Sequence, residues 1–536
     1  MKVRSDLMKL AKSMHTWVGV SSGILLFICF FAGGLSMFQH QISQWATPQQ
    51  QILPAIKSEQ YQQLIQQVQA KYPATEKSFV LNINSTEHQY APLTWTESDH
   101  DEGFNIDQST WLASLDAQGQ LITQQVNLSK AGWLIEQLHE TAGIPGVVGH
   151  HGLGVYVMGV VSILYFLALM TGLILLLPTL VKDYFAIRPG KNKKRFWLDT
   201  HNVVGITSVP FHIIICISVI VFAFHDFFYD SIGQLALKGK PVFNPSKQEQ
   251  IYIPSTQLDV DKILSQAKKV APEYSVDYIE FNNLDQPQKA SARIALYSSE
   301  QMLRGASNDF MRMHPYQVEK FNYNGINTQT DAGNKLINAM FSLHFGSFGG
   351  DTVRWIYLIF GMGGAFLFYS GNILWIETRA KKQKRAQDPI PEQRKDVTFF
   401  ANLTIGTCLG CILAITGTLL LSRWFYAIVD ITSMNYFFLY SYYFLFLFCT
   451  IYTFVIGYAK VLPQLLVAIS ISLILIPFTS LIALLIPNAG IWLHSNMVIW
   501  IDVIALCTAF IFIRFYQQAQ ERAKTAPEGS LWAPKA

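Results

Sequence analysis

Long apolar runs alternate with long polar stretches along the chain. A helix that crosses a bilayer needs about 20 mainly apolar residues. Eight runs reach about that length: Trp17–Phe38, Leu153–Leu180, Val203–Phe227, Val353–Ile376, Phe399–Leu421, Tyr436–Tyr458, Leu465–Ile486 and Met497–Phe515. The pattern therefore predicts an α-helical integral membrane protein with eight transmembrane helices.

Two polar stretches, residues 41–150 and 229–350, interrupt these runs, and each has the periodicity of a small α+β module. Ser58–Lys71 and Asp259–Val270 have the spacing of amphipathic helices. Alternating segments predict strands at Ser78–Asn84, Gln89–Thr96, Thr110–Leu115, Gln120–Val126, Val276–Phe281, Ala290–Tyr297 and twice within Asp309–Phe321. A short helix ends each stretch, at Trp133–Glu140 and at Lys335–Phe345, and glycines follow both. We expect the modules between helices 1 and 2 and between helices 3 and 4.

Residues 12–180 and 196–377 follow one plan, which predicts an internal repeat. Each copy has a His-x-x-Val-Gly motif, an apolar run, a module, a Leu-His pair before glycines, and a second apolar run. Thr171-Gly172 in the first copy corresponds to Ser370-Gly371 in the second. Both copies have the same orientation, so their pseudo-twofold axis should run along the membrane normal.

Lysine and arginine set the expected orientation. Residues 1–16, the loops 181–201 and 377–396, and the end of the chain are rich in these residues, whereas the short loops on the other side hold only Arg423. We therefore expect both termini in the cytoplasm and both modules outside it, at a bacterial inner membrane. The predicted parts are 1–40 (helix 1), 41–150 (module 1), 151–228 (helices 2 and 3), 229–350 (module 2), 351–380 (helix 4), 381–398 (linker), 399–516 (helices 5 to 8) and 517–536 (tail).

Composition agrees with a membrane protein, because 51% of the 536 residues are hydrophobic and only 14% are charged. The net charge of +4 follows from the orientation signal and gives no indication of nucleic-acid binding. All six cysteines fall inside predicted spans, so no disulfide framework is expected in the modules. Cys408 and Cys411 have redox-motif spacing, but small thiols that pack between helices are the simpler interpretation.

Four histidines recur in equivalent places of the two copies. The repeat axis would place His15 opposite His201 near the cytoplasmic surface, and His139 opposite His344 near the other surface. Two pairs of imidazoles at two depths of a helix bundle suit two bis-histidine b-type haems. The alternatives are interfacial or capping histidines without a ligand, or a zinc or copper site. No His-x-His or His-x-x-x-His spacing favours a compact metal site.

Other polar residues near the spans are weaker candidates. His212 follows His201 by about three helical turns and lies on the same helical face. It is a candidate haem neighbour, proton carrier or replacement ligand, with a structural role as the alternative. Arg195 and Arg354 are candidates to pair with haem propionates, with solvated anchoring as the alternative. His494 and Asp502 are separated by about two helical turns, which suggests a proton or quinol role.

At these residues the chain resembles the PepSY-associated transmembrane family, whose members include inner-membrane ferric-siderophore reductases. The resemblance rests on His15-Thr-Trp-Val-Gly19, Leu138-His139, Thr171-Gly172, Thr200-His201-Asn-Val-Val-Gly205 and Leu343-His344-Phe-Gly346, and covers roughly residues 8–380. The family commonly has arginine after the first histidine of the motif, whereas Thr16 and Asn202 stand here. The resemblance implies a di-haem protein that reduces ferric siderophores or other ferric chelates in the periplasm and releases ferrous iron.

The cytoplasmic loops limit the source of electrons. They are about 20 residues long, without a Gly-x-Gly-x-x-Gly motif or room for a nucleotide-binding fold. We therefore expect membrane quinol or a separate cytoplasmic reductase as donor, and the chelate between the two modules. Two other functions remain open: a transporter of iron chelates or another metal, and a regulatory protein whose modules bind peptides.

Overall fold

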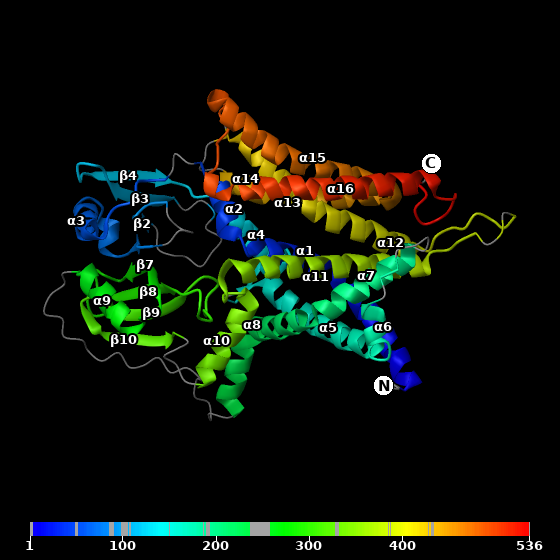
Figure 1. Ribbon diagram of the computed structural model, residues 1–536, viewed down its shortest axis with the longest axis horizontal. Coiled ribbons are helices and arrows are strands. Elements are labelled where there is room, and N and C mark those ends of the chain that lie inside the picture. The colour runs from blue at the N-terminus through cyan, green and yellow to red at the C-terminus, as the bar shows by residue number, and fades with distance from the viewer. Residues whose placement is uncertain are drawn as a thin grey trace. The chain divides into compact units, whose positions relative to one another are not determined.

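In the part of the chain that it describes, a computed structural model contains eight helices that are long and apolar enough to cross a membrane, as the apolar pattern predicts (Figure 1). The structure describes residues 4–48, 52–84, 90–97, 106, 109–149, 151–185, 187–188, 193–235, 258–326, 332–383, 385, 387–426, 428–429 and 434–534. The chain forms two compact units. One consists of residues 1–46, 130–224 and 358–536, and the other of residues 47–129 and 225–357.

The first unit contains most of the membrane helices. In its repeat region the helices are α1 (Ser5–Ser36), α2 (Gln39–Trp45), α4 (Ala131–Thr141), α5 (Leu153–Leu176), α6 (Leu180–Tyr184), α7 (Lys193–Thr207), and the larger parts of α8 (Val209–Leu235) and α11 (Gly350–Arg379). The C-terminal region contains α12 (Lys395–Thr404), a π-helical turn (Ile405–Leu409), α13 (Gly410–Phe425), α14 (Met434–Ile456), α15 (Tyr458–Leu485) and α16 (Trp500–Thr525). These helices extend several predicted spans at one or both ends, because apolar runs mark the lipid-buried part of a helix and not its polar ends.

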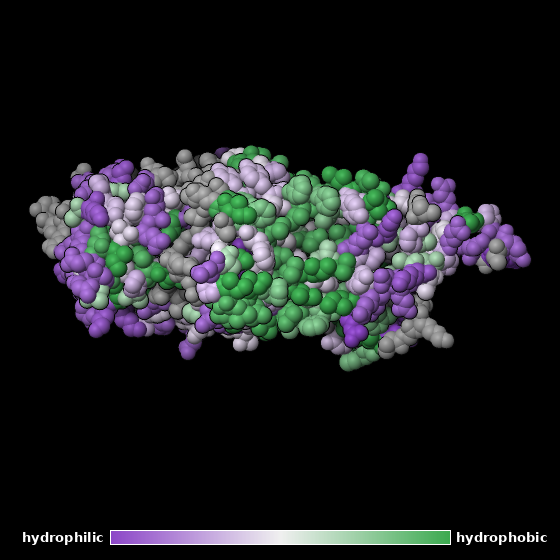
Figure 2. All heavy atoms as spheres, turned by 90° about the horizontal axis from the view of Figure 1, so that it is seen from above, coloured by the Kyte–Doolittle hydropathy of each residue, from purple (hydrophilic) through white to green (hydrophobic). Residues whose placement is uncertain are grey.

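Hydrophobic residues cover the surface of these helices in a broad band (Figure 2). On α14, for example, the side chains of Phe444 and Val455 are 69% and 73% exposed. Such a surface is unfavourable in water and is expected where lipid chains surround the protein. The chain is therefore a multi-pass membrane protein in a lipid bilayer.

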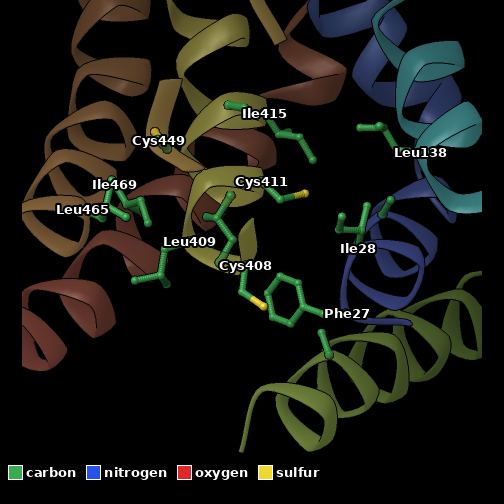
Figure 3. Close-up of a cluster of buried hydrophobic side chains, with 14 of the residues drawn as sticks. Phe27, Ile28, Leu138, Cys408, Leu409, Cys411, Ile415, Cys449, Leu465 and Ile469 are labelled. Atoms are coloured by element: carbon green, nitrogen blue, oxygen red, sulfur yellow. The ribbon is translucent and has the colours of Figure 1, made fainter. Parts of the chain in front are cut away.

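Small residues let helices of the repeats approach closely. A Cβ atom on Gly361 of α11 would lie 2.8 Å from the Cα atom of Gly34 on α1, so the two backbones are in contact there. Membrane helices associate through such small-residue contacts because lipid removes the usual hydrophobic driving force. The C-terminal helices pack on the same region: Phe27, Ile28 and Leu138 face Cys408 and Cys411 in one buried cluster (Figure 3).

The cysteines of this cluster are buried and free, with no disulfide among the described residues. Tyr442 donates a hydrogen bond of 3.6 Å to the Sγ atom of Cys411. This packing is what the simpler interpretation of the Cys408–Cys411 spacing predicts.

The second unit contains both polar modules, and they share one eight-stranded antiparallel sheet. Module 1 supplies α3 (Tyr61–Lys71), β1 (Phe79–Asn82), β2 (Leu93–Thr96), β3 (Thr110–Leu115) and β4 (Leu121–Val126). Module 2 supplies α9 (Val260–Val270), β7 (Ser275–Asn282), β8 (Ser291–Tyr297), β9 (Asp309–His314) and β10 (Gln317–Gly325). The strand order is β10-β9-β8-β7-β1-β2-β3-β4, so β1 and β7 join the modules. The start of the predicted strand at Gln89 lies outside the described residues.

This pairing corrects one expectation about the modules. Val80 stands opposite Glu280 and Leu81 stands opposite Ile279 across the β1–β7 ladder. The expected place for a chelate between two separate modules is therefore closed along this edge by backbone hydrogen bonds. Edge strands carry unpaired backbone groups, and pairing two modules edge to edge removes two such edges.

The element order of the two copies agrees with the predicted repeat. Each copy has a membrane helix, a helix with four strands, a short helix with a histidine in its last turn, and a second membrane helix. In the second copy the first membrane helix is divided at Ser208 into α7 and α8. Hydrogen bonds from Ser208 N to Val204 O and from His212 N to Ser208 O continue the helical pattern across the division.

Arg423 differs from its predicted place. The sequence placed it in a short outer loop, whereas the structure places it in the last turn of α13 with its side chain fully buried. Its guanidinium donates to Ser480 Oγ at 2.6 Å and to the carbonyl oxygen of Trp492 at 2.8 Å. Hydrogen bonds of this kind compensate for burial of a charged group, which hydropathy counting does not consider.

Candidate functional site

His15 lies against the second membrane helix of its own repeat. Its Nδ1 atom is 2.8 Å from the carbonyl oxygen of Ala168 on α5, and the Thr171 hydroxyl donates to the same oxygen at 3.0 Å. A carbonyl can only accept, so Nδ1 carries the proton of the neutral ring and Nε2 carries the lone pair. A Cβ atom on Gly172 would lie 3.0 Å from His15 Cε1, so glycine leaves room for the ring.

His201 has the equivalent environment in the second repeat. Its Nδ1 atom is 2.9 Å from the Ser370 hydroxyl oxygen on α11, and that hydroxyl donates to the carbonyl oxygen of Leu367 at 3.1 Å. The serine hydroxyl has one proton. When that proton is donated to Leu367, Nδ1 of His201 donates to the serine oxygen and Nε2 carries the lone pair, as in His15. Gly371 lies beside this ring, with a notional Cβ at 3.5 Å from Cε1.

The structure brings His15 and His201 near each other. Burial, and to a lesser extent the charge that His15 can carry, lower the pKa of His201 to about 4. A lowered pKa keeps the imidazole neutral at physiological pH, which is the form that binds a metal. No described residue is a hydrogen-bond partner of Nε2 in either ring.

His139 contacts α1 at a different depth from that of His15. It is in the last turn of α4, and its Nδ1 atom is 3.0 Å from the carbonyl oxygen of Cys29 on α1. Burial lowers the pKa of His139, against an opposing effect of this hydrogen bond. Because the Cys29 carbonyl can only accept a hydrogen bond, Nδ1 donates and Nε2 carries the lone pair. Cys29 lies about four turns beyond His15 on α1, which corresponds to about 21 Å along a helix.

A close contact fixes the position of the His139 ring. A Cβ atom on Gly33 of α1 would lie 2.5 Å from His139 Nδ1 and 2.7 Å from Cε1. These distances are far below van der Waals contact, so only glycine admits the imidazole at this place.

His344 belongs to the other unit, so its pairing with His139 stays a prediction. It lies in the last turn of α10 (Ala332–Phe345), in the place that corresponds to His139 on α4. The Tyr357 hydroxyl on α11 donates to the carbonyl oxygen of Leu343 at 2.6 Å and holds the end of α10 beside the first turns of α11.

The described donor set fits a bis-histidine haem. Three of the four predicted ligands have Nδ1 as the hydrogen-bond donor and Nε2 as the unprotonated nitrogen. Metal-binding histidines typically donate their second ring N–H to a carbonyl, carboxylate or similar acceptor, which orients the ring and fixes its tautomer. Histidines that serve only as interfacial residues have no need of this arrangement at two depths.

The two arginines suggested by the sequence have partners in the chain. Arg195 pairs with Asp199 at 3.3 Å, and Arg188 binds the same carboxylate through two hydrogen bonds of 2.9 and 2.7 Å. Hydrogen bonding and charge from Arg188 lower the pKa of Asp199. Arg354 pairs with Asp351 at 3.2 Å. Their contact with propionates therefore stays a prediction.

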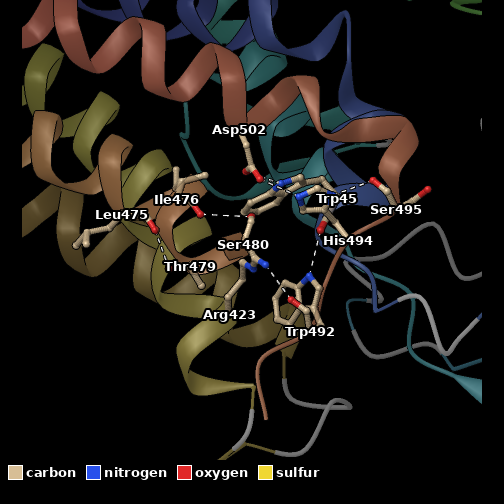
Figure 4. A network of polar contacts seen from close by, with 10 residues as sticks. All are labelled: Trp45, Arg423, Leu475, Ile476, Thr479, Ser480, Trp492, His494, Ser495 and Asp502. Carbon is tan, nitrogen blue, oxygen red and sulfur yellow. Dashed lines mark hydrogen bonds and ion pairs between the residues drawn. The ribbon is translucent and has the colours of Figure 1, made fainter. Parts of the chain in front are cut away.

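A buried polar network around Trp492 and His494, between the C-terminal helices, was only partly visible in the sequence (Figure 4). His494 Nε2 lies 2.9 Å from Asp502 Oδ2, as their spacing suggested. Trp45 Nε1 donates to Asp502 Oδ1 at 3.1 Å, and Trp492 Nε1 donates to the Trp45 carbonyl at 3.1 Å. Arg423 lies over the Trp45 ring, 5.0 Å from its centroid. No local pattern marks Trp45, because its partners lie near the opposite end of the sequence.

Comparison with known families places the repeats in one of them. The family model of the PepSY-associated TM region matches residues 12–378. No curated protein matches the chain. The matched region contains both repeats, both modules and all four predicted ligand histidines, and it ends before the C-terminal helices. The chain therefore belongs to the PepSY-associated transmembrane family.

Proposed function

We propose that the protein is a di-haem b electron-transfer protein of the bacterial inner membrane, and that it reduces ferric siderophores or similar ferric chelates in the periplasm. The main support is the common arrangement of His15, His201 and His139, whose Nδ1 atoms each face a fixed acceptor, which favours the tautomer in which Nε2 carries the lone pair that iron binds. His15 and His201 would hold the inner haem, and His139 and His344 the outer one. A haem held in this way accepts and donates one electron at a time.

The protein contributes orientation and insulation to this chemistry. Ala168 and Ser370 fix the two inner rings, and the Cys29 carbonyl fixes the outer ring. The surrounding apolar helices keep water and ions away from both levels. Electrons would come from membrane quinol or a separate cytoplasmic reductase, and would cross about 21 Å along α1 toward the periplasm.

A stoichiometric reduction experiment tests this function. Purified protein is reduced with dithionite, excess reductant is removed, and the sample is mixed anaerobically with a ferric hydroxamate chelate and a ferrous-specific chromogenic chelator. We expect the haem bands to reoxidise while about one ferrous ion appears per electron lost. A second arm uses the same hydroxamate chelator loaded with gallium, which cannot accept an electron under these conditions, as a control for haem reoxidation by other routes. Haem bands that stay reduced, with no ferrous iron trapped, would exclude ferric chelates as substrate.

A further inference from the structure

His212 is a fully buried histidine whose two ring nitrogens have no hydrogen-bond partner among the described residues. It lies near the start of α8, within a candidate membrane span. A buried polar group without a partner is destabilising, because it loses its hydrogen bonds to water and gains none in the protein. The first repeat avoids this cost, because Leu26 follows His15 at the same spacing at which His212 follows His201. A histidine is therefore not needed for packing at this place in the repeat.

Aromatic rings from the membrane helices of both repeats surround His212. Its ring centroid lies 5.4 Å from that of Phe30 on α1, 5.9 Å from that of Tyr165 on α5 and 5.4 Å from that of Phe211 on α8. Phe368 of α11 packs on both Phe30 and Tyr165 at 5.1 Å. A cation within about 6 Å of aromatic ring centroids is stabilised by their quadrupoles, most when it lies over the ring face. The cluster can therefore moderate the cost of a charge on His212.

The cluster lies between the two levels of ligand histidines. Phe30 directly follows Cys29, whose carbonyl binds His139, and Tyr165 is about one turn from Ala168, whose carbonyl binds His15. His212 itself lies about three turns beyond His201, or about 16 Å along a continuous helix. A charge on His212 therefore lies between the two levels.

Among the titratable groups of the cluster, His212 is the one whose ring can accept a proton. Tyr165 faces it from α5, and the thiols of Cys29 on α1 and Cys216 on α8 interact with Tyr165. From α11 the residues that pack here are the phenylalanines Phe360 and Phe368. Thiols and phenols are already protonated at neutral pH, with ordinary pKa values of about 8.5 and 10. The imidazole alone has a free basic nitrogen.

We propose that His212 is a redox-linked proton site, which binds one proton at a ring nitrogen when an electron enters the membrane-buried cofactors and releases it when the electron leaves. The proposal rests on the proposed function. An electron that enters a low-dielectric region adds one negative charge, and a proton from solvent on His212 balances it. One electron and one proton enter together, so the net charge of the cluster region is unchanged.

A redox titration of the full-length protein at several pH values tests the proposal. The haem α band is followed with mediators from about pH 5 to about pH 9, a range around the ordinary histidine pKa of about 6.5. One coupled proton makes the midpoint potential fall by up to about 59 mV per pH unit, since each unit is a tenfold change in proton concentration. Haem propionates also titrate, but they are present in every variant, so the difference between variants isolates His212.

His212→Leu is the matched variant, because leucine stands at the corresponding place of the first repeat. We expect it to keep both haems and to lose most of the pH-dependent slope. Tyr165→Phe keeps the ring and the slope. If the leucine variant does not fold, His212→Asn supplies a polar side chain that does not titrate, with the same expected loss.

A slope in the His212 variants equal to that of the unmodified protein would overturn the proton site while leaving the haem assignment intact. Loss of the slope in Tyr165→Phe but not in His212→Leu would assign the proton to the phenol instead. An unmodified protein without haem bands would contradict the proposed function itself, so the two failures are distinguishable.

Discussion

The placement of single residues explains why the sequence motifs have their composition. Thr171-Gly172 and Ser370-Gly371 look like ordinary helix-packing pairs, but each hydroxyl takes part in orienting a histidine and each glycine leaves space for its ring. The two repeats orient their histidines through different acceptors. His15 donates directly to a helix carbonyl, whereas His201 donates to a serine hydroxyl that donates to the corresponding carbonyl.

Gly33→Ala tests the tight contact at His139. A methyl group would lie 2.5 Å from Nδ1, so we expect the ring to move off the Cys29 carbonyl and the outer site to lose its haem. The haem-to-protein ratio should fall to about half. Gly363→Ala on α11 is the control, because the nearest atom to its Cβ would be Val204 Cγ1 at 3.6 Å, an ordinary contact distance, and alanine favours helix by up to about 1 kcal/mol. Full haem content in Gly33→Ala would contradict this account of the outer site.

Single functional residues could be predicted from the sequence where the same motif occurs in both repeats. The recurrence of His-x-x-Val-Gly and Leu-His identified the four candidate ligands without a structure. It did not reveal the Cys29 carbonyl as an acceptor, because every residue has a carbonyl and only the packing of α4 on α1 selects one. The orphan nitrogens of His212 are likewise a property of its surroundings.

At the scale of elements, the C-terminal helices contact the repeats at both ends of α16. Near the start of α16, Trp45 of α2 hydrogen bonds to Asp502 on α16 and to Trp492 in the loop before it. At the other end, Arg522 of α16 pairs with Glu377 of α11, and Trp532 donates to the same carboxylate at 3.1 Å. The predicted cytoplasmic tail is therefore packed at Trp532 and is not a free extension.

Asp502→Asn tests the contact between α16 and the first repeat at Trp45. His494 Nε2 and Asp502 Oδ2 form a buried hydrogen bond of 2.9 Å, and a hydrogen bond to a charged group typically contributes about 1.5–3 kcal/mol. We expect a loss near the lower value, since asparagine keeps the shape and one acceptor, measured as the free energy of unfolding in detergent micelles. Asp6→Asn, in the exposed pair with Arg4, should be neutral. Equal stability of both variants would show that the network does not hold the helices together.

Element types were predictable from apolar runs and periodicity, but ends were not. The charge of Arg423 ended a predicted span at Leu421, although α13 continues to Phe425. A hydrophobicity count treats an arginine as a stop, whereas the fold supplies Ser480 and the Trp492 carbonyl as partners. Long-range partners of this kind are absent from any local window.

On the scale of the molecule, the two modules are joined by strands from polar stretches that lie far apart in the sequence. Periodicity predicted both modules. It could not predict that β1 pairs with β7, because the sequence of an edge strand does not indicate which other strand it pairs with. The sheet order shows that module 1 and module 2 are one structural unit. We therefore expect them to fold and unfold together.

The variant pair Val80→Cys with Glu280→Cys tests this joint. The two residues are direct partners across β1 and β7, at Cα separations of about 4.5–5.5 Å that a disulfide can bridge. We expect a disulfide, detected by gel mobility after proteolysis between the modules. Val80→Cys with Arg312→Cys is the control, because Arg312 lies in the same row three strands away, at about 14 Å. Failure of the first pair to cross-link would contradict the shared sheet.

The visible spectrum of the purified protein, oxidised and dithionite-reduced, tests whether two histidine pairs each hold a haem. We expect a Soret band and split reduced α and β bands. His201→Ala should lose about half of the haem, and His344→Ala should lose about half from the other site. His314→Ala should keep all of it, because His314 instead contacts the Pro287 carbonyl in the sheet at 2.8 Å. Absence of a Soret band, or loss of all haem from one ligand substitution, would contradict two independent histidine pairs.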